Sequence, residues 1–182
     1  MDKPAFKNRG NEEVKLPDGR TVWLSRSPAV VAVVLGIYKD NIFALTEKRS
    51  RNMQDEPGKL AIVSGYLDWD ESGWEGITRE LFEETSFDVR KYKGLLIFDN
   101  DQQPWFVNTD PGENRQNVSM TYIMIYDFSK GLPREVEKFQ DSEIESVRWM
   151  PVEYVFKTDQ EWAFNHDERI AMAVEKFEKY LI

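Results

Sequence analysis

Residues 65–87 read GYLDWDESGWEGITRELFEETSF and contain the most informative pattern in the chain. Ser72, with Glu75 three positions later, forms the pattern of a capping box, which marks the start of a helix. The apolar residues that follow recur at the spacing of one helical face: Trp74, Ile77 and Leu81. The pattern therefore predicts a helix over residues 72–85.

This helix carries three glutamates close together, at Glu80, Glu83 and Glu84. At 100° per residue they fall within an arc of about 100°, so they share one face. Like charges at these spacings destabilise a helix by a few tenths of a kcal/mol per pair, which favours a bound counter-charge. Mg²⁺ or Mn²⁺ prefers carboxylate oxygen and completes its shell with phosphate. The cluster thus indicates phosphate-ester chemistry, the alternative being a solvated helix face.

The spacing of the whole segment matches a known signature. Gly65 is followed by Glu71 after five residues, and RELFEE occupies residues 79–84 after seven more, with an apolar Phe87 closing the pattern. This is the arrangement of the Nudix box, so the chain resembles the Nudix hydrolases. The resemblance implies an α+β fold, an α/β/α sandwich around a mixed sheet, with Mg²⁺ or Mn²⁺ as cofactor. Ser86 stands where the box has glycine, at a modest strain penalty in a left-handed cap.

The resemblance also implies roles for the matching residues. Glu80, Glu83 and Glu84 would be metal ligands, and Glu80 would also take the proton from the attacking water. Arg79 would orient this face by pairing with a carboxylate. The expected reaction is attack of water on a phosphorus of a diphosphate linkage.

Two further box positions are expected to be structural. Gly65 would allow the backbone to turn, and Glu71 would support the loop before the helix. Family members often recruit one more acid from a later loop, and Glu143 is favoured here over Glu137 and Asp141. The alternative is that these three are ordinary surface acids.

The box does not identify the substrate. Pro104 lies near where a proline occurs in enzymes that act on ADP-ribose, while residues 103–105 faintly resemble the start of an array in NADH pyrophosphatases. ADP-ribose or a related nucleoside diphosphate sugar is therefore expected ahead of NADH, dinucleoside polyphosphates or nucleoside triphosphates. A catalytically silent, nucleotide-sensing Nudix domain is the alternative from another class, although every box carboxylate is present.

Five side chains are candidates for contact with the substrate. Trp105 and Phe106 could stack on a nucleobase, or could instead hold their loop against the core. Arg49, Arg51 and Arg115 offer bidentate donors to phosphate, with ordinary surface pairing as the alternative.

Composition narrows the remaining possibilities. Of 182 residues, 33 are Asp or Glu and 24 are Lys or Arg, and the net charge of −9 disfavours nucleic acid as a partner. The absence of cysteine excludes disulfides, Cys-ligated zinc and thiol catalysis. His166 is the single histidine and is expected at the surface. No apolar run is long enough to cross a bilayer, so a cytoplasmic protein without a membrane partner is expected.

The order of the remaining elements suits a single Nudix domain over residues 1–182. Residues 1–27 form an extension with a hairpin around residues 17–19, and the last expected helix covers residues 161–181. Residues 99–117 read as a long polar loop. The expected strands cover residues 29–38, 42–46, 60–63, 95–98, 118–128 and 147–150. The hairpin resembles the extra strands through which ADP-ribose pyrophosphatases form dimers, so a homodimer is expected.

Overall fold

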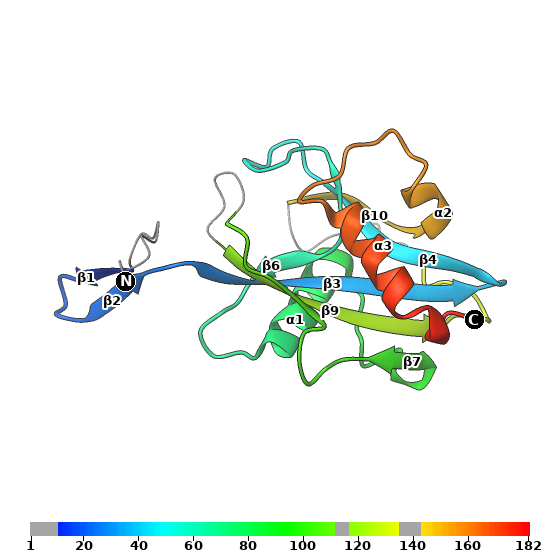
Figure 1. Cartoon of the computed structure of the whole chain (residues 1–182), viewed down its shortest axis with the longest axis horizontal. Coiled ribbons are helices and arrows are strands. Elements are labelled where there is room, and N and C mark those ends of the chain that lie inside the picture. The colour runs from blue at the N-terminus through cyan, green and yellow to red at the C-terminus, as the bar shows by residue number, and fades with distance from the viewer. Residues whose placement is uncertain (1–10, 112–116, 135–142) are drawn as a thin grey trace, which may run out of the picture.

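The computed structural model describes residues 11–111, 117–134 and 143–182. A mixed sheet forms its centre, with strands in the order β10-β4-β3-β9-β7 and three short strands paired beside them (Figure 1). The strands of this path are β3 (Ser27–Tyr38), β4 (Asn41–Arg49), β7 (Leu96–Asp99), β9 (Asn117–Asp127) and β10 (Ile144–Pro151). The short strands are β5 (Leu60–Ala61), β6 (Ser64–Tyr66) and β8 (Phe106–Asn108), which pair with β4, β3 and β9.

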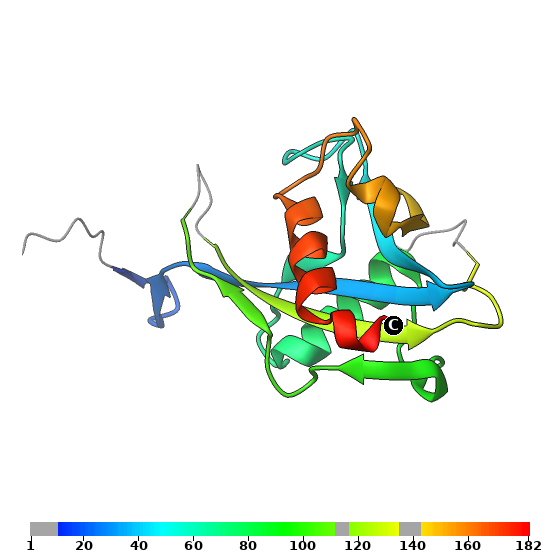
Figure 2. The ribbon, with the colours of Figure 1, turned by 45° about the vertical axis from the view of Figure 1, so that its right-hand side comes forward.

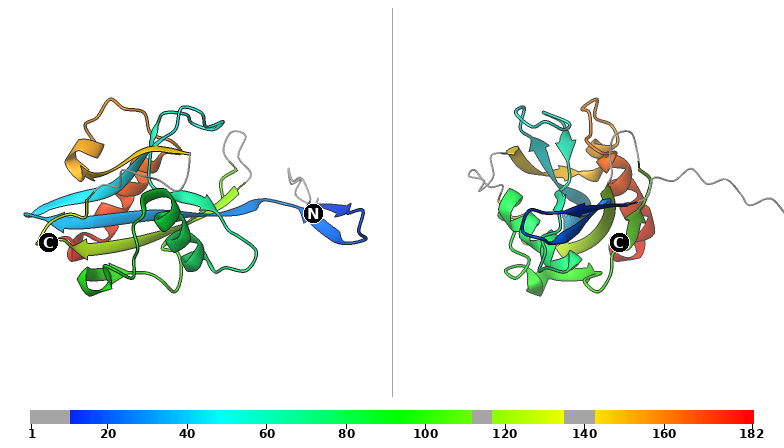
Figure 3. Two further views of the ribbon diagram at one scale, coloured as in Figure 1. Left: turned by 180° about the vertical axis from the view of Figure 1, so that it is seen from behind. Right: turned by 90° about the vertical axis from the view of Figure 1, so that its left-hand side faces the viewer.

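Two helical layers cover the sheet, and this explains why β3 is almost wholly apolar. Along β3, Val31 and its alternate neighbours pack with α3 (His166–Lys176), while Val30 and its alternate neighbours pack with α1 (Gly73–Thr85). The views in Figure 2 and on the left of Figure 3 show the two helices on opposite faces. The predicted sandwich is confirmed.

The helix α1 begins as its sequence predicts. Ser72 caps α1 by accepting a hydrogen bond from the Glu75 backbone N–H, and the Glu75 carboxylate accepts one from the Ser72 N–H at 2.8 Å. The remaining helical elements are α2 (Val152–Val155) and the 3₁₀ helices η1 (Lys93–Leu95) and η2 (Glu178–Tyr180).

Two sequence predictions are wrong: the start of the last helix and the description of residues 99–117 as one loop. The last helix begins at His166 rather than at residue 161, because Phe164 and Asn165 take left-handed backbone angles, φ 58° and 55°. Residues 99–117 are not one long loop, since β8 lies within them and pairs with β9 through Phe106 and Thr121. A three-residue strand is too short to show a periodic pattern, so the sequence gives no signal for it.

The predicted hairpin is present and extends away from the body of the molecule (Figure 1; Figure 3). It consists of β1 (Glu12–Lys15) and β2 (Thr21–Leu24), paired with each other. Trp23 is 62% exposed and Leu24 57% exposed. An isolated two-stranded hairpin is only marginally stable in water. The hairpin therefore gains little support from its own two strands, and it carries two large exposed apolar side chains. Within the described residues, no helix has the length and apolar character to span a membrane.

Ser86 ends α1 in the left-handed region, with φ 55°, and its backbone N–H donates to Phe82 O. A β carbon at this angle is strained, so Ser86→Gly should raise the free energy of unfolding by about 0.5–1 kcal/mol. Urea unfolding measures this change. Ser86→Ala keeps a β carbon at the same φ and should show no gain. A loss of stability in Ser86→Gly would mean that the serine side chain contributes more than its backbone angle costs.

Candidate active site

One guanidinium group connects the acidic side chains of the box. Arg79 Nη1 donates to Glu80 Oε1 and to Glu83 Oε2, each at 2.9 Å. Its Nε and Nη2 donate to the two oxygens of Glu71, at 3.0 and 2.7 Å. Arg79 therefore neutralises and positions three carboxylates at once. In addition, Nη2 donates to Tyr66 O at 3.2 Å, which joins this network to β6.

Position 65 requires a glycine because the Glu80 side chain packs directly against its backbone, and not because of an unusual backbone angle. A β carbon built at this position would lie 2.1 Å from Glu80 Oε1. Gly65 is not among the glycines with positive φ, so the expected backbone turn is not the reason for a glycine here. The absence of a side chain lets the Glu80 carboxylate rest directly on β6.

Glu71 connects the loop before α1 to the helix. Its carboxylate accepts from the Asp68 backbone N–H at 2.8 Å as well as from Arg79. The hydrogen bond from Arg79 is the main cause that lowers the pKa of Glu71 below its usual range. Glu71 is thus ionised, and it joins the loop at Asp68 to Arg79 of α1.

The three helix glutamates differ in exposure. Glu84 is 4% exposed, whereas Glu83 is half-buried. Burial raises the pKa of Glu80 despite the hydrogen bond from Arg79. Ionised carboxylates removed from water need compensation by positive charge.

An all-oxygen donor set of this kind fits a hard divalent cation. Among the residues that the structure describes, no three acidic or histidine side chains converge as a ready-made metal site. Arg79 supplies the positive charge to Glu80 and Glu83 instead. That Glu80, Glu83 and Glu84 hold Mg²⁺ or Mn²⁺ stays a prediction from the box pattern.

The other candidates for catalysis and phosphate binding lie on β4 and the loops beside it. Arg49 is buried and donates through Nε and Nη2 to Asp55 O, at 3.2 and 3.1 Å, so it is engaged inside the fold. Arg51 is exposed.

Glu143, the favoured later acid, is exposed and lies beside the end of β4, where its backbone carbonyl accepts from Ser50 N at 2.7 Å. Three candidates lie outside the described residues: Arg115, Glu137 and Asp141.

The two loop aromatics both pack near α3. Trp105 meets Phe177 edge to face, with ring centroids 5.6 Å apart. Phe106 lies beneath the guanidinium of Arg169, whose Cζ is 3.8 Å from the ring centroid. Each ring thus holds its segment against the C-terminal part of the chain, and stacking on a nucleobase stays a prediction.

The expectation that His166 lies at the surface is wrong. The side chain is 4% exposed, and its Nδ1 accepts a hydrogen bond from the Ile62 backbone N–H at 3.2 Å. The charged residues 167–169 that follow suggested an exposed site. The better signal is the spacing of His166, Ile170 and Ala173, which form the buried stripe of α3.

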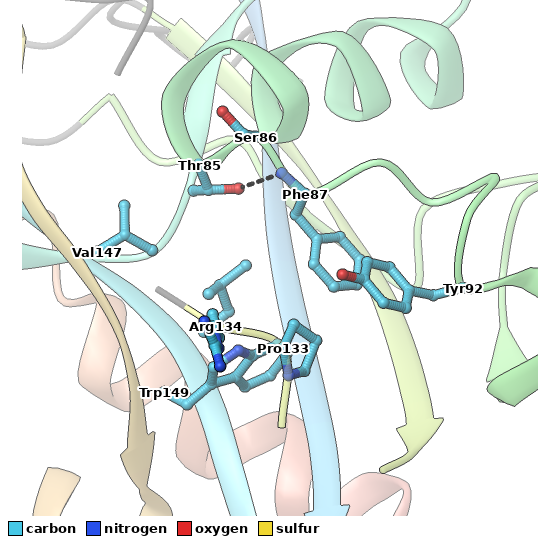
Figure 4. Close-up of a pocket in the computed structure, with 9 residues that line it drawn as sticks. Thr85, Ser86, Phe87, Tyr92, Pro133, Arg134, Val147 and Trp149 are labelled. Carbon is cyan, nitrogen blue, oxygen red and sulfur yellow. Dashed lines mark hydrogen bonds between the residues drawn. The ribbon is translucent and has the colours of Figure 1, made fainter. Parts of the chain in front are cut away.

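A cavity of about 80 Å³ lies at the C-terminal end of α1 (Figure 4). Phe87 and Tyr92 stack along one side, with ring centroids 4.7 Å apart, and Thr85 Oγ1 accepts from Phe87 N at 3.2 Å. Its other lining residues are Leu45, Ser86, Pro133, Arg134, Val147 and Trp149. A second cavity, of about 380 Å³, is lined by Lys48, Pro57, Gly58, Lys59, Gln160 and Glu161. Neither is lined by the box glutamates, so the chemistry suggested by the carboxylates lies outside both.

Comparison with known proteins gives consistent results. Residues 26–172 match the NUDIX domain family. The chain is 27% identical over 152 residues to Nudix hydrolase 5 of Arabidopsis thaliana, an alignment that covers 79% of this chain and 44% of the relative. The chain therefore spans less than half the length of this curated relative.

Solved structures show the same fold at low identity. The NUDIX domain of Shewanella oneidensis NrtR in complex with ADP ribose superposes with a TM-score of 0.59 and 19% identity, over 84% of this chain and 88% of that one. A bifunctional NMN adenylyltransferase/ADP ribose pyrophosphatase from Francisella tularensis, in complex with AMP and a manganese ion, superposes with a TM-score of 0.61 and 19% identity. This superposition covers 83% of this chain and 42% of that one. A mutT/nudix family protein from Listeria innocua superposes with a TM-score of 0.63 and 19% identity, over 85% of this chain and 96% of that one. Since the family match extends over most of the sequence, the chain belongs to the NUDIX domain family.

Proposed function

We propose that the chain is a Mg²⁺- or Mn²⁺-dependent hydrolase of the diphosphate linkage in ADP-ribose or a related nucleoside diphosphate sugar. The products are a nucleoside monophosphate and a sugar phosphate. The single observation that carries this proposal is the face of α1 on which Arg79 pairs with Glu80 and Glu83, with Glu80 packed against the glycine of β6. The ADP ribose, AMP and manganese in the structures of similar proteins support the choice of substrate and cofactor.

Each residue has a defined part in the proposed reaction. Glu80, Glu83 and Glu84 hold the cation, which when bound neutralises charge that develops on phosphoryl oxygens. Glu80 accepts a proton from the attacking water as general base. Arg79 keeps the carboxylates in place. Glu143 is a second candidate base because it lies on the loop that precedes β10.

Substrate contacts complete the proposal. Arg51 and Arg115 are assigned to phosphate, and Trp105 and Phe106 to the nucleobase. Arg49 is not assigned to the substrate, because it is buried and its guanidinium donates to Asp55 O. Trp23 and Leu24 on the hairpin are assigned to the contact with a second copy of the chain, which would cover their exposed surface.

A nucleotide-sensing role is the second candidate. Structures of NrtR, including one in complex with a 27mer DNA, share the fold at 19% identity. The complete set of box carboxylates favours the enzyme. NADH, dinucleoside polyphosphates and nucleoside triphosphates are the other candidate substrates for an enzyme.

A substrate panel tests the proposal. We expect Mg²⁺- or Mn²⁺-dependent cleavage of ADP-ribose or a sugar nucleotide, with a nucleoside monophosphate as product by chromatography. The panel also contains NADH, a dinucleoside tetraphosphate and nucleoside triphosphates. Cleavage of only NADH, the dinucleoside tetraphosphate or the triphosphates would show that the substrate is not a nucleoside diphosphate sugar. Nucleotide binding without cleavage of any compound would favour the nucleotide-sensing role.

A further inference from the structure

The strands β3 and β4 pair with each other over only part of their length. Their pairing ends at Leu35 and Ala44, and residues 60–66 then take its place on both sides. β5, at the start of these residues, pairs with β4, and β6, at their end, pairs with β3. We refer to residues 60–66 as the bridging segment. Its partner strand changes at residues 62 and 63.

At this change of partner, a side chain provides the acceptor for a backbone donor. The Ile62 N–H donates to His166 Nδ1 at 3.2 Å, and both residues are buried. A buried backbone N–H that is left without an acceptor costs the full desolvation of the group, so the bond matters for the local backbone. Because Nδ1 accepts, the proton of the imidazole ring lies on Nε2.

The same end of α3 contacts the bridging segment at a second place. Leu60 N donates to Glu161 O at 3.0 Å, and Leu60 O accepts from Ala163 N at 2.7 Å. The His166 side chain then contacts the segment two residues closer to β6. The first residue of α3 and the residues before it therefore fix the first half of the bridging segment.

The second half of the bridging segment carries two contacts of the candidate active site. Gly65 lies so close to the Glu80 carboxylate that a β carbon there would be 2.1 Å from Glu80 Oε1. Tyr66 O accepts from Arg79 Nη2 at 3.2 Å. Ile62 precedes Gly65 by only three residues, so a displacement of the backbone at Ile62 moves the surface on which Glu80 rests.

We propose that His166 is a positioning residue for the candidate active site, because it fixes the bridging segment at Ile62 and thereby places Gly65 against Glu80. This inference rests on the proposed function, since it concerns the same carboxylate. His166 acts through the backbone of the bridging segment and is not assigned to substrate or metal. Its role depends on the acceptor at Nδ1 and not on the volume of the ring.

Two substitutions separate the acceptor from the ring. His166→Leu puts a methyl group in place of Nδ1, whereas His166→Asn keeps an acceptor oxygen at the same number of bonds from the backbone but loses most of the ring. In His166→Leu, kcat for the preferred diphosphate should fall about tenfold, as a displacement of Glu80 by less than 1 Å allows, with KM within about twofold. His166→Asn should keep kcat within about twofold of the wild type, although its midpoint of urea unfolding falls.

Ile170→Ala is the matched control for lost stability. Ile170 lies one turn later on the buried stripe of α3, and its truncation leaves a cavity, so the unfolding midpoint should fall at least as far as in His166→Leu. Its kcat, measured where all variants are folded, should stay within about twofold of the wild type. An equal loss of kcat in Ile170→Ala or in His166→Asn, or an unchanged kcat in His166→Leu, would overturn the positioning role.

Nuclear magnetic resonance tests the same role without turnover. In His166→Leu the Ile62 amide should exchange with solvent at least tenfold faster, and the signals of the Gly65 amide and of Arg79 Nε–H should shift. In His166→Asn and Ile170→Ala these two signals should stay near their wild-type positions. Unchanged Gly65 and Arg79 signals in His166→Leu would overturn the positioning role.

The two measurements separate this inference from the proposed function. If the wild-type protein cleaved no diphosphate but the Gly65 and Arg79 signals moved in His166→Leu alone, the placement of Gly65 by His166 would be confirmed. The proposed function would be contradicted instead.

Discussion

Glu84→Gln should lower the turnover of the preferred diphosphate substrate by about two to three orders of magnitude, the usual effect of removing one group that stabilises transition-state charge. Glu84 is 4% exposed on the inner side of α1, and glutamine has the same shape, so packing is retained. The amide lacks the negative charge with which the carboxylate would bind a cation. The midpoint of urea unfolding should therefore change little, while turnover, measured as the phosphate that added alkaline phosphatase releases from the two products, falls steeply.

The control for this variant is Glu153→Gln on α2. Glu153 is exposed and pairs with Lys157 Nζ at 3.5 Å. It should retain full turnover and wild-type stability. Full turnover in Glu84→Gln would show that Glu84 is not part of the metal site, and a variant that unfolds would be replaced by Glu84→Asp.

Gly65→Ala should reduce turnover about 100-fold, because displacement of a catalytic group by about 1 Å has an effect of this size. The added methyl group would meet Glu80 Oε1 at 2.1 Å, so the carboxylate must leave its place on β6. The atom that has to move is the end of a flexible side chain. The free energy of unfolding should therefore fall by only about 1 kcal/mol, at the lower end of overpacking effects.

Gly94→Ala is the matched control, since a β carbon at Gly94 meets nothing within 4 Å. Steady-state kinetics and urea unfolding of the two variants separate a local effect from a general one. Equal turnover in both would mean that the position of Glu80 against Gly65 does not matter for the reaction. If Gly65→Ala greatly lowered the free energy of unfolding but hardly changed turnover, Gly65 would be needed for stability and not for the reaction.

The elements that the sequence predicts are those with long local patterns. The capping box at Ser72 and the glutamates on one face of α1 follow from the pattern of residues 72–84, and the strand pair β3 and β4 follows from two apolar runs on either side of residues 39–41. The box pattern also implied that Gly65 and Glu71 are structural, although it did not reveal the reason. Close approach of Glu80 to Gly65 is a contact between separate elements and becomes visible only in the folded chain.

The features that the sequence did not predict depend on contacts between distant segments. His166 is buried because Ile62, more than a hundred residues earlier, donates to it. The late start of α3 follows from the pairing of Leu60 with residues 161–163. Arg169 gave no signal of its own, because its environment is created by β8 and β9.

The proposed function requires the glutamates of α1 to bind a divalent cation. Titration with Mn²⁺, followed by the electron paramagnetic resonance signal of the free ion, tests it most directly. The wild-type protein and Glu153→Gln should show the same saturable binding, and the double variant Glu80→Gln/Glu84→Gln should lose it. Equal Mn²⁺ binding by all three proteins would contradict the claim.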